Sequence, residues 1–152
     1  MSARMLLRSI SLTGIFASLP LWLALAAMVQ ALPAASSQFI EPGFDAKFAN
    51  DGDPKTRWAS DYGARSGWLE IDLGEEQEIG SVYVSEIEWP ETREFAIEVK
   101  QGDAWKEVAR GTTIGADKEI MIQPVKARQV RLNVKQSANA ININEFQVFG
   151  NH

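Results

Sequence analysis

The chain has 152 residues, of which 45% are hydrophobic and 23% charged, and its formal net charge is -5 at pH 7. This composition is typical of a globular protein with a buried core, and the length suits one domain plus a targeting segment. The acidic balance, without a basic stripe, argues against binding to nucleic acid or to anionic lipid.

Residues 1–31 have the pattern of an export signal. Arg4 and Arg8 provide a positive start, and an apolar, Leu/Ala-rich stretch follows from Ile10 to Val29. The alternative is an uncleaved membrane anchor, because the apolar stretch approaches the span of a bilayer. Small residues suited to signal cleavage favour removal, and we place the cut after Ala31.

The remaining residues, 32–152, are expected to form one exported domain, located in the periplasm, outside the cell or at the cell surface. This part has 13 basic and 20 acidic residues and a net charge of -7. The chain contains no cysteine, so an exported domain of this kind must be stabilised by its core or by a metal. Its only histidine is the last residue, His152, which removes nearly every route to histidine catalysis or zinc binding.

Residues 49–56, Ala-Asn-Asp-Gly-Asp-Pro-Lys-Thr, form a segment that we call the acidic loop. The glycine and the proline at its centre favour a chain that curls back on itself. Such a curl would turn backbone carbonyls, the carboxylates of Asp51 and Asp53 and the hydroxyl of Thr56 toward one point, as a calcium site requires. A plain acidic surface turn is the alternative, and this loop alone does not decide between them.

Short segments in which apolar and polar residues alternate follow the acidic loop. A period of two predicts half-buried antiparallel strands, and many short strands between turns indicate a β-sandwich or jelly roll. We expect Gly74 to end the first long run and Pro124 to end the run that contains Ile122. The side chains expected to face the core are those of Leu69, Ile71, Leu73, Val82, Val84, Phe95, Ile97, Val99, Ile120, Ile122, Val130, Leu132 and Val134.

The last strand changes its inward face partway along. Ile141 and Ile143 predict that Glu145 also points inward, whereas the apolar residues after it have the opposite phase. The change of phase requires a β-bulge near residues 144–146, a feature that re-aims a side chain.

An inward carboxylate at Glu145 needs a partner, because burying an unpaired charge costs several kcal/mol. A cation shared with Asp51 and Asp53 would remove this cost. The alternative is an ion pair between Glu145 and one of three arginines, namely Arg57, Arg128 and Arg131. The change of phase and the acidic loop together favour the metal.

Several stretches of the chain resemble a known family. They are residues 49–60, which end in Arg-Trp-Ala-Ser, residues 68–74 (Trp-Leu-Glu-Ile-Asp-Leu-Gly), residues 130–132 (Val-Arg-Leu) and residues 143–150 (Ile-Asn-Glu-Phe-Gln-Val-Phe-Gly). They resemble the coagulation factor five/eight type C (discoidin) domain, and the resemblance covers about residues 34–150. It implies an all-β fold, a galactose-binding-like jelly roll in which about eight antiparallel strands form a β-sandwich.

A narrower likeness runs through residues 86–89, 93–95 and 105–115. It resembles the version of the domain that accompanies bacterial and plant alpha-L-fucosidases, whose loop corresponds to Gly111–Gly115 here. The catalytic barrel of those enzymes is absent from the chain, so their hydrolytic activity does not carry over.

Carbohydrate-binding members of this family often hold a structural calcium. The resemblance places it on the backbone carbonyl of Ala49 and on Asp51, Asp53, Thr56 and Glu145, in agreement with the separate argument from the inward carboxylate. Its role would be to join the first loop to the last strand and to stabilise the fold. The chain lacks the disulfide of the blood-clotting members and the loop histidine of many galactose-binding members, which argues against galactose recognition of that kind.

A saccharide site needs an aromatic surface for the apolar face of a sugar and planar polar groups for its hydroxyls. The candidates are Tyr62, Arg65, Trp89 and Arg93, all in loops or at strand ends. For each there is a structural alternative: rim packing for Trp89, a solvated loop with an Arg–Asp pair for Tyr62 and Arg65, and pairing with a neighbouring glutamate for Arg93. Phe44 is a weaker candidate.

The other tryptophans, Trp58, Trp68 and Trp105, flank or open strands and are expected to pack on the core or the sheets. The neighbouring glutamates Glu86 and Glu88 alternate at a strand end, and we expect them to be solvated, like Glu75 and Glu76. We therefore expect an exported, non-catalytic, lectin-like module that binds a carbohydrate or glycoconjugate. The alternative is a cell-surface adhesion module whose ligand is a protein.

Overall fold

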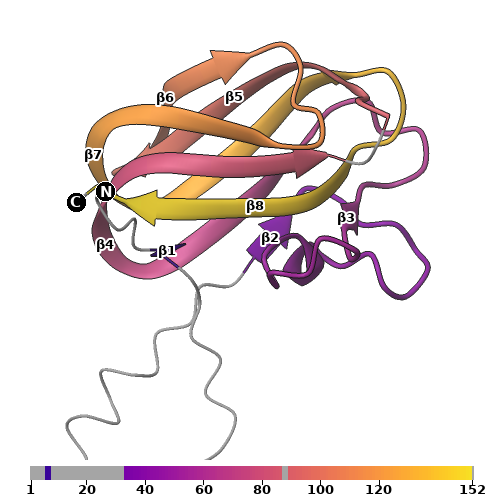
Figure 1. Cartoon of the computed structure of the whole chain (residues 1–152), viewed down its shortest axis with the longest axis horizontal. Coiled ribbons are helices and arrows are strands. Elements are labelled where there is room, and N and C mark those ends of the chain that lie inside the picture. The colour runs from indigo at the N-terminus through magenta and orange to yellow at the C-terminus, as the bar shows by residue number, and fades with distance from the viewer. Residues whose placement is uncertain (1–5, 8–32, 87–88, 152) are drawn as a thin grey trace, which may run out of the picture.

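The computed structural model describes residues 6–7, 33–86 and 89–151 (Figure 1). Every strand pairing among these residues is antiparallel, and the one helical element is a single 3-10 turn. The elements are β1 (Leu6–Leu7), β2 (Pro33–Ala35), the 3-10 turn η1 (Ala46–Ala49), β3 (Trp58–Ala59), β4 (Gly67–Glu86), β5 (Thr92–Gln101), β6 (Ala104–Gly111), β7 (Lys118–Ser137) and β8 (Asn142–Gly150). The predicted all-β fold is confirmed.

The two 20-residue strands, β4 and β7, take part in both layers of the sandwich. Residues 67–72 of β4 pair with residues 129–134 of β7 in a layer that also contains β2, β5 and β6. The second half of β4 pairs with the first half of β7 and with β8 in the other layer, where β3 and β1 lie on the outer edge of β8. Figure 1 shows both strands curling from one layer into the other at the left-hand end of the molecule.

The core lies between the two layers and consists of the side chains that the alternation predicts. Most of those expected residues are at most 5% exposed, and the fully buried Trp58 joins them, as predicted, while Ile120 is only half-buried. Because alternate residues of a strand point to opposite faces, the long strands each contribute an apolar row to the core, and in β4 and β5 some residues of the opposite row are covered as well.

The expected strand ends at Gly74 and Pro124 are wrong, because both residues lie inside long strands. The β4–β7 ladder shifts register between Asp72 and Gln77, and Gly74, with φ of 84°, lies in this bend. Pro124 lies where the same ladder shifts register again, so its missing N–H leaves no ladder hydrogen bond unmade. Each residue marks a bend in a continuing strand.

The predicted export signal, residues 1–31, lies outside the described residues except for Leu6–Leu7, which pair with β8 as β1. Within the part of the chain that the structure describes, no helix is long and apolar enough to cross a membrane.

Candidate functional site

The acidic loop is fixed to β8 by two asparagine side chains. Asn50 Nδ2 donates a hydrogen bond of 2.7 Å to the carbonyl of Phe146. From the opposite side, Asn144 Nδ2 donates to the carbonyls of Pro54, at 3.0 Å, and Thr56, at 3.3 Å. These contacts join residues about 90 positions apart and hold the loop against the bulged part of the last strand.

The predicted bulge is confirmed at Asn144. Ser85 of β4 pairs with Glu145, but the next residue, Glu86, pairs with Ile143, so Asn144 is the extra residue on β8. Glu145 is buried, with 4% of its surface exposed. Its Oε2 accepts a hydrogen bond of 2.9 Å from Gln147, whereas its buried Oε1 has no partner among the described residues.

The three arginines that could pair with Glu145 all bind other groups. Arg57 Nε donates to Asn142 Oδ1 at 3.1 Å. Arg128 Nε lies 2.7 Å from Asp72 Oδ1, and Arg131 Nε donates to Glu98 Oε2 at 2.7 Å. The ion-pair alternative therefore finds no support in these contacts.

Several oxygen atoms of the acidic loop gather around the hydroxyl of Thr56. Thr56 Oγ1 donates to Asp51 Oδ2 at 2.7 Å, and the carbonyls of Asp53 and Phe48 lie 2.9 and 3.3 Å from it. One carboxylate oxygen of Asp53 accepts a hydrogen bond of 2.9 Å from the backbone N–H of Lys55. Ala49 is fully buried and directly follows Phe48.

The pKa of Glu145 is raised to about 7, mainly because burial disfavours the charged form and also because the carboxyl of Asp51 lies beside it, while Gln147 and the backbone N–H of Gly52 act in the opposite direction. The carboxyl groups of Asp51 and Glu145 therefore face each other across the junction between the acidic loop and β8. Among the described residues, no three His, Cys, Asp or Glu side chains are grouped as a metal site, so a cation here would need neutral oxygens as well.

Neutral oxygens are present at this junction. Of the four buried side-chain atoms that lack a partner in the described part of the chain, three belong to it: Asn50 Oδ1, Asn144 Oδ1 and Glu145 Oε1. Asp51, Thr56 and the loop carbonyls add further oxygens at the same junction, and oxygen ligands are those that a hard cation such as calcium prefers.

A second cluster lies at the end of the sandwich drawn on the right in Figure 1, where three connections meet. The N–H groups of Ser137 and Ala138 donate to the carbonyls of Arg65 and Glu91, at 2.7 and 2.8 Å, and Ile141 N–H donates to Ser60 Oγ at 2.9 Å. We call these connections, residues 60–66, 89–91 and 137–141, the loop end.

Two aromatic side chains project from the loop end. Tyr62 is 93% exposed and Trp89 is 71% exposed, so neither packs into the rim. Arg65 is also exposed, and the structure brings its loop beside the one that carries Trp89. Arg93 Nη1 donates to the carbonyl of Pro90 at 2.9 Å, and within the described residues it forms no pair with Glu91 or Glu94.

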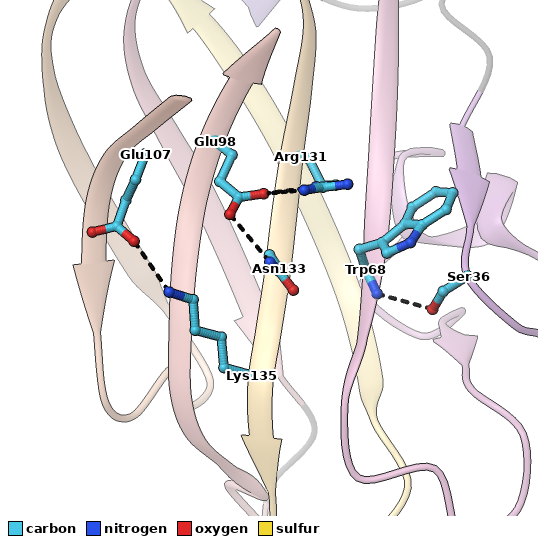
Figure 2. A network of polar contacts seen from close by, with 7 residues as sticks. All are labelled: Ser36, Trp68, Glu98, Glu107, Arg131, Asn133 and Lys135. Atoms are coloured by element: carbon cyan, nitrogen blue, oxygen red, sulfur yellow. Dashed lines mark hydrogen bonds and ion pairs between the residues drawn. The ribbon is translucent and has the colours of Figure 1, made fainter. Parts of the chain in front are cut away.

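Trp68 and Trp105 pack on a sheet, as predicted, and the weaker candidate Phe44 is packed too. Trp68 and Trp105 are half-buried on the outer face of the β4–β7–β5–β6 layer, where the guanidinium of Arg131 lies 5.9 and 4.2 Å from their ring centres. Figure 2 shows Glu98 bound to Arg131 and Asn133 on this face. Phe44 is half-buried beneath the guanidinium of Arg57, 4.9 Å from its ring centre.

The expectation that Glu86 is solvated is wrong, since only 2% of it is exposed. Its Oε1 accepts hydrogen bonds from Thr92 N at 2.7 Å, from Thr92 Oγ1 at 2.9 Å and from Glu91 N at 2.9 Å, and its Oε2 accepts from Gly115 N at 3.2 Å. Glu86 thus fixes one side of the connection that carries Trp89. The sequence contained the signal, because Glu86 continues the inward row of Val82 and Val84; its partner Glu88 lies outside the described residues.

Comparison with known proteins gives a clear family. The model of the F5/8 type C domain matches residues 33–146. Chitosan-binding module 2 of a chitosanase/glucanase from Paenibacillus sp. IK-5, solved with chitotriose, is 30% identical; the match covers 79% of this chain and 96% of that one, with a TM-score of 0.72. Comparison with curated sequences gives no match.

Two further solved structures share the fold. A GH29 fucosidase from Ruminococcus gnavus, solved with fucose, is 25% identical over 80% of this chain, with a TM-score of 0.74, but the match spans only 25% of the enzyme. The family 32 carbohydrate-binding module of C. perfringens NanJ, solved with galactose, is 19% identical over 78% of this chain and 93% of its own length, with a TM-score of 0.68.

Proposed function

Since the chain belongs to the F5/8 type C domain family and has the fold of its carbohydrate-binding modules, we propose that it is a non-catalytic module that binds a saccharide at the loop end. The observation that carries this proposal is the match, along nearly the whole length of a chitosan-binding module, to residues that here form the β-sandwich. The likeness to the fucosidase spans a quarter of that enzyme, which is consistent with a binding role.

Tyr62 and Trp89 are the residues that we assign to stacking on the sugar rings. Both are exposed aromatic side chains, and they come from connections that converge on consecutive N–H groups of residues 137–138. Arg65, in the same loop as Tyr62, supplies a planar group for sugar hydroxyls. An aromatic surface beside a few polar groups is the usual composition of a saccharide site.

Glu86, which is buried and belongs to the Glu86 and Glu88 pair, does not support catalysis. Both carboxylate oxygens of Glu86 accept hydrogen bonds from the surrounding chain, which leaves neither free to act as an acid or base. Glu75 and Glu76 are exposed. No observation on the described residues favours the alternative of an adhesion module for a protein ligand.

The second part of the proposal is a structural calcium between the acidic loop and β8. Asp51 and Glu145 would provide carboxylate ligands, Thr56 its hydroxyl, and Asp53 and Ala49 their backbone carbonyls. The support is the buried Glu145 Oε1, which has no partner in the part of the chain that the structure describes, and the oxygens that gather around Thr56. A bound cation would compensate the two facing carboxylates and join the acidic loop to the last strand, which adds stability but no chemistry.

The binding site is tested by calorimetric titration with chitotriose and by a glycan array that includes fucose- and galactose-containing glycans. We expect Trp89→Ala and Tyr62→Ala each to weaken binding by roughly tenfold or more, because each removes a stacking surface. Met121→Ala, which removes an exposed apolar side chain of β7, is the matched control. A folded protein that binds no glycan, or that loses nothing in the two aromatic variants, would overturn the assignment.

The calcium site is tested by thermal unfolding of Asp51→Ala with calcium and with chelator. At calcium concentrations about 100-fold above Kd, the metal adds roughly 2.7 kcal/mol to the free energy of unfolding, so the variant should melt lower than the natural protein only when calcium is present. Asp103→Ala, at an exposed turn, is the control. An equal loss in chelator would remove the metal from the explanation.

Export is part of the same proposal, on the pattern of residues 1–31. Mass spectrometry of the protein recovered outside the cytoplasm of an expressing bacterium should give an N-terminus near residue 32. Retention of residue 1 in that fraction would favour the uncleaved anchor.

A further inference from the structure

A cavity of about 310 Å³ opens between the ends of β5, β6 and β7, next to the connection that carries Trp89. Its rim carries three cationic side chains: Arg93, Arg110 and Lys135. The volume lies at the lower end of the range of small-ligand pockets, about 300–1,000 Å³, and suits a single sugar unit.

The floor of the cavity is built from Phe95 and Gly111, which face each other in the β5–β6 ladder. A Cβ atom on Gly111 would lie 2.7 Å from two ring carbons of Phe95, so the ring packs directly on the glycine backbone. Phe95 is 1% exposed, which makes this floor part of the rigid core.

The position of Lys135 follows from a second bulge. Glu94 pairs with Gln136 and Phe95 with Val134, so Lys135 is an extra residue on β7. Bulges re-aim side chains, and here Lys135 joins the cavity rim while its Nζ lies 3.2 Å from Glu107 Oε2 (Figure 2).

The cations of the rim outnumber their carboxylates. Arg110 and Lys135 share the single carboxylate of Glu107, which Arg110 approaches to 2.6 Å, and these cations lower the pKa of Glu107, Lys135 most strongly. Arg93 Nη1 donates to two neutral carbonyls, those of Pro90 and Thr92. Among the described residues, Glu94 is the acidic side chain of the lining and Glu107 lies beside it, so three cations face two carboxylates there, on a chain whose net charge is -5.

We propose that this cavity binds the carboxylate-bearing unit of an acidic saccharide, a uronic acid, whose neighbouring units lie on Trp89. Guanidinium groups bind planar carboxylates through paired hydrogen bonds, and Arg93 joins the cavity to the Trp89 connection through the carbonyl of Pro90. The ion pairs of Arg110 and Lys135 with Glu107 are exposed and weak, so these cations can turn to a ligand at little cost. The part that involves Trp89 rests on the proposed function, whereas the cavity itself does not.

The test is a titration of the ¹⁵N-labelled protein followed by NMR, with D-glucuronate, D-glucose and acetate as probes at equal ionic strength. Glucuronate and glucose differ only in the carboxylate. We expect glucuronate to shift the amide signals of Gly111 and Thr112 in a saturable way, and glucose to leave them unchanged. If acetate binds as tightly as glucuronate, the site is one for small anions and the saccharide proposal is overturned. The absence of a saturable shift with glucuronate also overturns it.

Variants locate the effect. Arg93→Gln combined with Arg110→Gln should weaken glucuronate binding about tenfold or more, since both removed groups are charged donors. Arg110→Gln alone, at a side chain that is 82% exposed and so safe for folding, should give a smaller loss. Arg128→Gln, the same change at an exposed arginine bound to Asp72, is the control, and an equal loss there would show a general charge effect and refute the cavity.

The same titration separates the two proposals. Trp89→Ala should weaken binding of chitotriose by roughly tenfold or more and leave the glucuronate shifts at Gly111 and Thr112 in place. Loss of chitotriose binding alone therefore speaks only to the loop end, and absence of glucuronate binding speaks only to the cavity.

Discussion

The acidic loop and the loop end are both connections at the edge of one sandwich, but they use their side chains in opposite ways. Where the acidic loop meets β8, Asn50 and Asn144 hold the two together, and a carboxylate oxygen of Glu145 is buried without a partner among the described residues. In the loop end, backbone hydrogen bonds join the connections, and the large side chains of Tyr62 and Trp89 stand in solvent. The acidic loop thus adjoins buried polar groups that have no hydrogen-bond partner among the described residues. The loop end instead presents aromatic surface to solvent.

This difference separates stability from recognition. A buried polar group without a partner raises the free energy of the fold, so whatever satisfies it stabilises the protein. Exposed aromatic side chains contribute little to the free energy of folding. They contribute to the free energy of binding, when a ligand covers them. We therefore expect changes in the acidic loop to act on stability and changes in the loop end to act on binding.

Glu86 is where this separation should fail, and its removal should have the largest effect on stability. It ends β4 and anchors the loop end, it is as buried as Glu145, and both of its carboxylate oxygens accept hydrogen bonds, from Glu91, Thr92 and Gly115. Glu86→Ala leaves these donors buried and should lower the free energy of unfolding by about 4 kcal/mol. Urea unfolding measures it.

The same variant should also weaken chitotriose binding, because the connection that carries Trp89 loses its anchor. Glu86→Gln, which keeps one oxygen for the donors at Oε1, should restore most of both properties. Glu76→Ala, at an exposed glutamate of the same strand, should change stability by no more than about 0.5 kcal/mol. A loss of stability without any loss of binding would show that Trp89 does not depend on this anchor.

The pH dependence of stability tests the role of Glu145, next to the acidic loop. The pKa of Glu145 is about 7 in the folded chain, above its ordinary value of 4.5, so the folded state binds this proton more tightly than the unfolded state does. The stability that the protonated Glu145 adds to the folded chain is fully present below pH 4.5 and is lost as the pH rises to about 7. In chelator, this loss should amount to about 3 kcal/mol.

The measurement is a set of urea unfolding curves from about pH 4.5 to about pH 8 in chelator, for the natural protein and for Glu145→Gln. The variant has no titrating group at this position, so the difference between the two proteins isolates Glu145. Calcium should reduce the pH dependence that Glu145 causes. The reason is that calcium and the proton compete for the same carboxylate, and bound calcium favours its ionised form. Two parallel curves in chelator would contradict the assigned pKa.

The fold could be predicted from the sequence because each strand has its own apolar row, as Leu69, Ile71 and Leu73 show. The strand ends predicted at Gly74 and Pro124 are wrong for a physical reason: a residue that breaks pairing ends a strand only if the chain also changes direction there. In β4 and β7 both sit at register shifts where the strand bends into the other layer. Local sequence does not contain the pairing partner that decides this.

The residues of the candidate site could be predicted only where they belong to a strand in which inward and outward side chains alternate. The inward row of the last strand identified Glu145 and its bulge, and the same rule applied to Val82 and Val84 would have identified Glu86. The gathering of Arg65, Glu91 and Ser137 was beyond the sequence, because hydrogen bonds between residues tens of positions apart depend on the arrangement of the layers. The exposure of Trp89, unlike that of Trp58, follows from the same arrangement.

The smallest expected effect comes from a matched pair of asparagines, one in each region. Asn144 Nδ2 donates to two carbonyls of the acidic loop in a partly buried setting, whereas Asn139 Nδ2 donates to the exposed carboxylate of Glu91 at 2.7 Å. Asn144→Ala should lower the free energy of unfolding by about 1 kcal/mol and weaken calcium binding, because the loop is no longer held on the bulge. Asn139→Ala should change stability by less than about 0.5 kcal/mol, since water replaces an exposed hydrogen bond. Equal effects of the two substitutions on urea unfolding would mean that the acidic loop is held no more firmly than the loop end, and the contrast between the two regions would then rest on Glu145 alone.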